Sequence, residues 1–121
     1  MISTKDISKV IAQSQGQVNE QDTSLIVAHL PALNERLAFL SDSFSKNTLH
    51  AIAVKTNPHP QMLKHLVDLG YGLEAASIEE VNMAIAAGCP ADKIVFDSPV
   101  KTRSEIDCVS EMTGMLVNVN S

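Results

Sequence analysis

The feature that most constrains the fold is a regular alternation of short apolar runs and amphipathic segments from residue 48 onward. Four runs have the length and composition of β-strands, at residues 48–55, 72–77, 93–99 and 115–120. The segments between them have helical spacing, at residues 60–70, 78–88 and 102–114. The first two helical segments end at Gly70 and Gly88, as is common for helix termini. This β-α-β-α-β-α-β order, with its short connections, predicts a parallel sheet with right-handed crossovers.

The N-terminal part of the chain is less regular. Residues 2–14 carry apolar side chains at roughly helical spacing, and a stretch without periodicity follows them. Residues 24–30 form a short apolar run that predicts a β-strand, and Pro31 predicts the start of a second helix. The predicted organisation is an N-terminal helix with its linker over residues 1–23, followed by an α/β domain over residues 24–121.

The alternation fits two architectures, an open parallel sheet or part of a (β/α)₈ barrel. Continuous apolar strands favour a sheet that is covered on both faces. No GxGxxG follows the first strand and no GxxxxGK[ST] occurs, so the two most common nucleotide-binding versions lose support. The sequence stops at Ser121, directly after its fourth strand, whereas a complete barrel needs about 250 residues. The sequence therefore predicts about half of a (β/α)₈ TIM barrel, truncated after the fourth strand.

Composition argues against several classes of partner. The formal net charge of −5 disfavours nucleic-acid and anionic-membrane surfaces. No apolar run approaches the roughly 20 residues of a transmembrane helix, and the N-terminus lacks a signal-peptide core. Cys89 and Cys108 form no CxxC and no metal-ligand pattern, so we expect buried free thiols in a reducing compartment. We expect a cytoplasmic protein without nucleic-acid, membrane or metal partners.

Candidate functional residues follow from the strand ends, where parallel α/β folds gather their functional side chains. The polar residues at these positions are Lys55, Thr56, Asn57, Glu74, Ser77, Asp97, Ser98, Lys101, Asn118, Asn120 and Ser121. Among them a lysine has a specific use, because in low-dielectric surroundings its amine becomes nucleophilic and can form a Schiff base. A lysine that only solubilises the strand end explains the same position without any chemistry.

A series of motifs occurs in order along the chain. They are A-V-K-x-N-P at 53–58, L-G-x-G at 69–72, an acidic-x-A-S-x-x-E segment at 74–80, A-A-G at 86–88 and P-x-K at 99–101. With these motifs the chain from about Ser24 to Ser121 resembles the N-terminal part of the barrel in the fold-type III pyridoxal-phosphate-dependent decarboxylases. That family comprises the ornithine, diaminopimelate and arginine decarboxylases.

The resemblance implies a role for five residues. Lys55 would hold pyridoxal 5′-phosphate as a Schiff base, which the amino group of the substrate displaces before carbon dioxide leaves. Glu74 matches an aspartate beside the cofactor and is one methylene longer. Ser77 and Glu80 match a cofactor-binding segment, although S-x-x-E also predicts a helix capping box. Lys101 matches a lysine expected to orient neighbouring polar groups.

Three hypotheses for function result. The first is the N-terminal part of a decarboxylase that acts on a small amino-acid substrate and forms a homo-oligomer, the fragment alone being inactive. It would be inactive because the resemblance implies a phosphate-binding loop and a β-domain later in the chain. The second is a non-enzymatic half-barrel that associates through open sheet edges. The third is an alanine-racemase-like pyridoxal protein.

Overall fold

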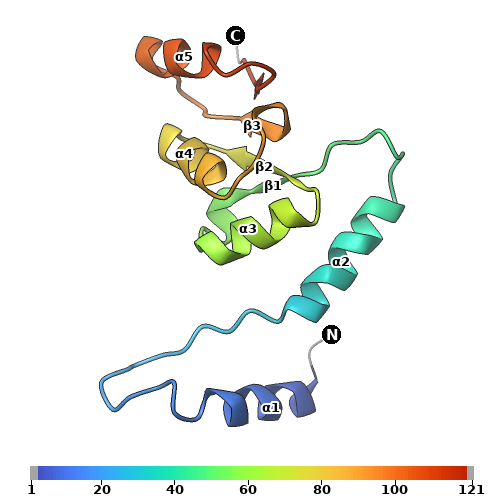
Figure 1. The fold of residues 1–121 in the computed structure, drawn as a ribbon, viewed down its shortest axis with the longest axis vertical. Helices are drawn as coiled ribbons and strands as arrows, with labels where there is room; N and C mark the ends of the chain where they lie inside the picture. The colour runs from blue at the N-terminus through green and yellow to red at the C-terminus, as the bar shows by residue number, and fades with distance from the viewer. Residues whose placement is uncertain (1–2, 120–121) are drawn as a thin grey trace. The chain divides into compact units, whose positions relative to one another are not determined.

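The computed structural model of the chain describes residues 3–119. They belong to two units, which meet in the sequence between Lys46 and Asn47 (Figure 1). The second unit contains all the strands of the described chain.

Two helices form the regular part of the first unit. Helix α1, Thr4–Ser14, begins at Ser3, whose hydroxyl accepts the Asp6 N–H while the Asp6 carboxylate accepts the Ser3 N–H. This reciprocal pair is a capping box. Helix α2, Leu30–Asp42, begins at His29, whose Nδ1 accepts the Ala32 N–H at 3.1 Å. Both predicted helices are therefore confirmed.

The prediction of a short strand over residues 24–30 is wrong. Residues 24–29 have no regular secondary structure, and Leu30 already belongs to α2. A strand needs a neighbour to pair its backbone N–H and C=O groups, and every strand pairing of the described chain lies within residues 51–117. Ile26 is 93% exposed, so its apolar side chain does not hold the segment against a core either.

The second unit is a four-stranded parallel sheet with strand order β1-β2-β3-β4 (Figure 1). Its strands are β1 Ala51–Ala53, β2 Gly72–Ala75, β3 Ile94–Phe96 and β4 Leu116–Val117. The connecting helices are α3 Pro60–Asp68, α4 Ile78–Ala86 and α5 Arg103–Ser110, with short 3₁₀ turns η1 Val54–Thr56 and η2 Ala91–Lys93. Sequential parallel strands with one helix per crossover confirm the predicted α/β repeat.

The glycines predicted to stop α3 and α4 do so by the same geometry. Gly70 has φ +91°, and its N–H donates to the Val67 carbonyl while the Tyr71 N–H donates to the Leu66 carbonyl. This pair of bonds is a Schellman motif, which places the residue after Leu69 in the left-handed region that favours glycine. Gly88, with φ +85°, ends α4 in the same way.

Only one face of the sheet carries fully buried strand side chains in the part of the chain that the structure describes. On that face Ala75 and Phe96 form a core cluster with Val81 of α4 and Val109 of α5. The opposite face carries four residues in register, Ala53, Glu74, Val95 and Leu116. The first three are partly buried, and Leu116 is 52% exposed. A barrel strand buries this inner face only when the barrel closes around it.

The two cysteines are free, as predicted, but only one is buried. Cys89 follows the glycine that ends α4, and burial raises the pKa of its thiol. The expectation of burial is wrong for Cys108, which is exposed because α5 turns its neighbour Val109 toward the core. Among residues 3–119 no helix is long and apolar enough to cross a membrane. The same residues include no cluster of three potential metal ligands.

Candidate functional site

The predicted lysine lies on a tight turn at the end of β1. The strand stops at Ala53 and the chain turns out of the sheet over η1, so the strand is shorter than the predicted 48–55. Val54 is fully buried, whereas Lys55 is exposed, which differs from the low-dielectric surroundings considered from the sequence. Among residues 3–119, Lys55 takes part in no ion pair or hydrogen bond of its amine. The turn therefore presents an unengaged primary amine at the carboxyl end of the sheet.

The turn breaks one rung of the β1–β2 ladder. The Gly72 N–H donates to the His50 carbonyl, and with the observed register the Val54 carbonyl would accept the Ala76 N–H two rungs later. Instead, the Val54 carbonyl accepts the Asn57 N–H at 3.2 Å within the turn. The Ala76 N–H is left without its strand partner.

Glu80 supplies the missing acceptor. Its carboxylate accepts the Ala76 N–H at 2.8 Å, while its own N–H donates to the Ser77 hydroxyl at 3.3 Å. Ser77 is thus the N-cap of α4, as the S-x-x-E pattern predicts. The reciprocal bond of a capping box would reach the Ser77 N–H, but the Glu80 carboxylate reaches one residue further back. Ser77 and Glu80 therefore tie the end of β2 to the start of α4, next to the turn that carries Lys55.

Glu74 lies on the partly uncovered face of the sheet. It is in register with Ala53 of β1 and Val95 of β3, so its side chain leaves the sheet on the same side as theirs. In the described part of the chain it forms no ion pair with Lys55. Lys55 and Glu74 thus come from the ends of adjacent strands, with no ion pair between them in the described chain.

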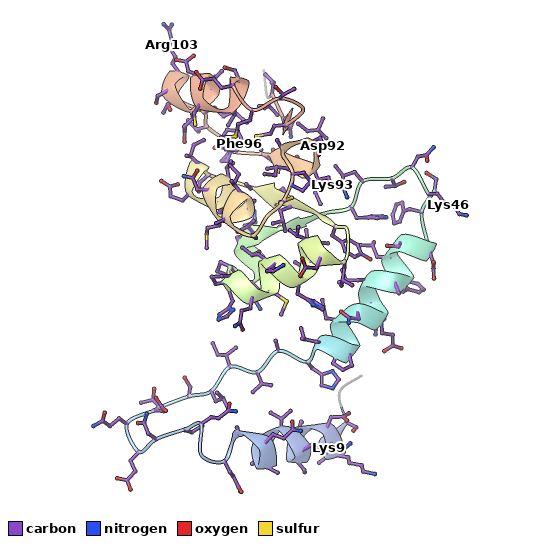
Figure 2. All side chains as sticks on the ribbon, in the orientation of Figure 1. Lys9, Lys46, Asp92, Lys93, Phe96 and Arg103 are labelled. Atoms are coloured by element: carbon purple, nitrogen blue, oxygen red, sulfur yellow. The ribbon has the colours of Figure 1, made fainter. Side chains whose placement is uncertain are left out.

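The ends of β3 and β4 carry a second polar group. Asn118 Nδ2 donates to Asp97 Oδ1 at 2.8 Å. The two residues follow β4 and β3, and the register of these strands places them next to each other. Lys101 Nζ donates to the Ser98 carbonyl at 2.6 Å and lies 5.2 Å from the centroid of the Phe96 ring, labelled in Figure 2. Lys101 therefore closes the loop after β3. Asn120 and Ser121, also named from the sequence, lie outside the described residues.

One contributor to the site, Ala76, was missed from the sequence, and another, Thr56, was named there without a role. Ala76 contributes only its backbone N–H, and an alanine gives no signal of such a role. The Thr56 hydroxyl donates to the Ala53 carbonyl at 2.7 Å and so closes the lysine turn. Its signal is present in the sequence, because threonine hydroxyls commonly bond to carbonyls three residues earlier.

Residues 30–121 match the family model described as pyridoxal-dependent decarboxylase, pyridoxal binding domain. The chain belongs to this family. It is 33% identical over 100 residues to diaminopimelate decarboxylase from Bacteroides thetaiotaomicron, covering 83% of this chain and 25% of that protein. It is 29% identical over 106 residues to ornithine decarboxylase 2 from Drosophila melanogaster, covering 88% and 26%. The chain spans about a quarter of the length of these relatives.

Solved structures confirm the fold. AQ1208 from Aquifex aeolicus superposes with a TM-score of 0.67 at 32% identity, over 74% of this chain and 22% of that one. Diaminopimelate decarboxylase from Helicobacter pylori, complexed with L-lysine, gives a TM-score of 0.79 at 24% identity, over 91% and 28%. The predicted family, the α/β barrel fold and the pyridoxal cofactor of the family are thus confirmed.

Proposed function

We propose that the chain provides the lysine-bearing strands of the barrel in a pyridoxal-phosphate-dependent amino-acid decarboxylase, and that Lys55 holds the cofactor. The supporting observation is the exposed, unengaged amine that η1 presents at the carboxyl end of β1. A primary amine without an ion-pair partner is the group that an aldehyde needs for covalent attachment. The residues present therefore fit the cofactor of the family.

The other site residues have different roles in this proposal. Bound pyridoxal phosphate supplies the electron-accepting ring that loss of carbon dioxide from an amino acid requires. The Glu74 carboxylate, on the face beside the end of β1, would supply a negative charge near a cofactor held by Lys55. Ser77 and Glu80 act through the backbone, because their hydrogen bonds fix the strand end next to the lysine turn.

The chain alone is proposed to lack decarboxylase activity. It spans about a quarter of the length of the curated relatives, so about three quarters of those proteins have no counterpart in it. We propose that residues outside this chain supply most of the phosphate binding and select the amino acid, so that the chain alone holds pyridoxal phosphate only weakly at its strand ends. We also propose a homodimeric parent enzyme of the cytoplasm, where the two free thiols would stay reduced.

The test is to trap the cofactor on the chain. The Lys55 amine condenses with the aldehyde, releases water and forms a C=N bond, which borohydride reduces to a stable secondary amine. Mass spectrometry of the digested chain should show the adduct on Lys55 ahead of Lys46, an exposed reference lysine. Lys55→Arg should remove the adduct from that peptide. Labelling of Lys55 no faster than Lys46 would overturn the proposal.

A second candidate function rests on the uncovered face of the sheet. Leu116 is 52% exposed there, beside the partly buried Val95. An apolar sheet face of this kind favours association with another protein surface. The chain would then act as a half-barrel that binds a second copy, without any reaction of its own.

A further inference from the structure

We propose that Thr56 is a positioning residue for Lys55, an inference that rests on the function proposed above. Two hydrogen bonds span the lysine. The Thr56 hydroxyl donates to the Ala53 carbonyl at 2.7 Å, and the Asn57 N–H donates to the Val54 carbonyl at 3.2 Å. Each bond joins a residue before Lys55 to one after it, so the two bonds restrict the backbone conformation at Lys55.

The Ala53 carbonyl needs this partner because of its place in the sheet. Along a parallel strand, successive carbonyls point to opposite sides. The His50 carbonyl accepts the Gly72 N–H of β2, and the register places the Ile52 carbonyl on the same side. The Ala53 carbonyl therefore belongs to the other side of β1. In the described sheet β1 is an edge strand. The Thr56 hydroxyl therefore satisfies an acceptor that no other strand of the described sheet reaches, and it does so by folding the turn back on the strand.

The consequence for Lys55 is a fixed starting point for a flexible side chain. Val54 is fully buried and anchors the turn on one side of the lysine, while the Thr56 bond anchors it on the other. A lysine side chain has four rotatable bonds, so its amine samples many positions around its Cα. Fixing the Cα and its direction raises the fraction of positions from which the amine meets an aldehyde held at the strand ends.

Three variants of the chain test the role. Thr56→Val keeps the β-branched shape and removes the donor, Thr56→Ser keeps the donor, and Thr23→Val changes an exposed threonine of the first unit. The first readout is hydrogen exchange of the Asn57 amide, which needs no cofactor. The second is the ratio of borohydride-trapped pyridoxal phosphate on Lys55 to that on Lys46. Trapping with acetaldehyde, which has no phosphate or ring to orient it, gives the reference ratio.

Both readouts are expected to depend on the hydroxyl donor at residue 56. Because one hydrogen bond is lost, Thr56→Val should speed Asn57 exchange and lower the Lys55 ratio with pyridoxal phosphate by about two- to fivefold. The acetaldehyde ratio should stay constant, Thr56→Ser should restore both readouts, and Thr23→Val should change neither. Unchanged Asn57 exchange, or a Lys55 preference that survives Thr56→Val, would overturn the positioning role alone. If native Lys55 shows no preference over Lys46, the proposed function fails and this inference fails with it.

Discussion

Replacing Glu80 by alanine should destabilise the second unit, because it removes the acceptor that Ala76 needs. The Glu80 carboxylate accepts the partly buried Ala76 N–H at 2.8 Å, and the β1 turn has already taken away the strand carbonyl that could replace it. A hydrogen bond to a charged group contributes about 1.5–3 kcal/mol when buried. Since Ala76 is only partly buried and water can reach the strand end, we expect a loss of about 1–2 kcal/mol.

The matched control is Glu79→Ala. Glu79 precedes Glu80 in the first turn of α4 and is exposed, so both variants lose the same favourable interaction with the helix N-terminus, about 0.3–1 kcal/mol. Only Glu80 accepts the Ala76 N–H. The difference between the two variants therefore isolates that hydrogen bond.

The assay is urea unfolding followed by circular dichroism, with the free energy of unfolding extrapolated to water. Glu80→Ala should lose about 1–2 kcal/mol more than Glu79→Ala, and Glu80→Gln, which keeps an oxygen acceptor, should fall between them. Hydrogen exchange should show the Ala76 amide opening in Glu80→Ala. If the two alanine variants are equally stable, Glu80 does not replace the missing rung and the structural argument for its role fails.

Three further predictions concern other parts of the second unit. Gly72→Ala should lower the free energy of unfolding by about 2–3 kcal/mol, because a Cβ at residue 72 would overlap the Lys93 carbonyl oxygen. The urea midpoint should fall with it, and an unchanged midpoint would refute this prediction. The Thr102 N–H and hydroxyl donate to the Glu105 carboxylate and lower its pKa. The stability that this α5 cap contributes should therefore be complete above the ordinary glutamate pKa, and it should be lost as the pH falls through the lowered pKa of Glu105 in the folded chain. An NMR titration should show this lowered pKa relax in Thr102→Ala, and equal values in both chains would contradict it. Light scattering should show the chain as a dimer or larger, with Leu116→Asp shifted toward monomer, whereas a native monomer at high concentration would count against association through the uncovered face.

Local patterns in the sequence predicted much of the second unit because their physical causes are local. A glycine that can adopt positive φ ends a helix wherever it stands, and Gly70 and Gly88 do so. A serine three residues before a glutamate caps a helix without help from the rest of the chain, as Ser77 does. The order of strands and helices then leaves few topologies, and the observed sheet is the simplest of them.

The errors have the opposite cause, since they concern residues whose state depends on distant partners. Residues 24–30 have the composition of a strand but no strand to pair with. Cys108 has the apolar character of a buried residue, yet its burial depends on which side of α5 meets the sheet. Composition and spacing do not tell whether a second strand pairs with residues 24–30, or which side of α5 packs against the sheet.

Two of the motifs that carried the resemblance are linked through one hydrogen bond from a backbone N–H that spacing could not reveal. The A-V-K motif turns the chain out of β1 to expose Lys55, and this turn removes the Val54 carbonyl from the ladder. The orphaned N–H belongs to Ala76, within the second motif, and the final glutamate of that motif, Glu80, accepts it. An unpaired, partly buried N–H would oppose the turn, so Glu80 stabilises the conformation that presents the lysine. Glu80 therefore needs no contact with Lys55 to support the proposed chemistry.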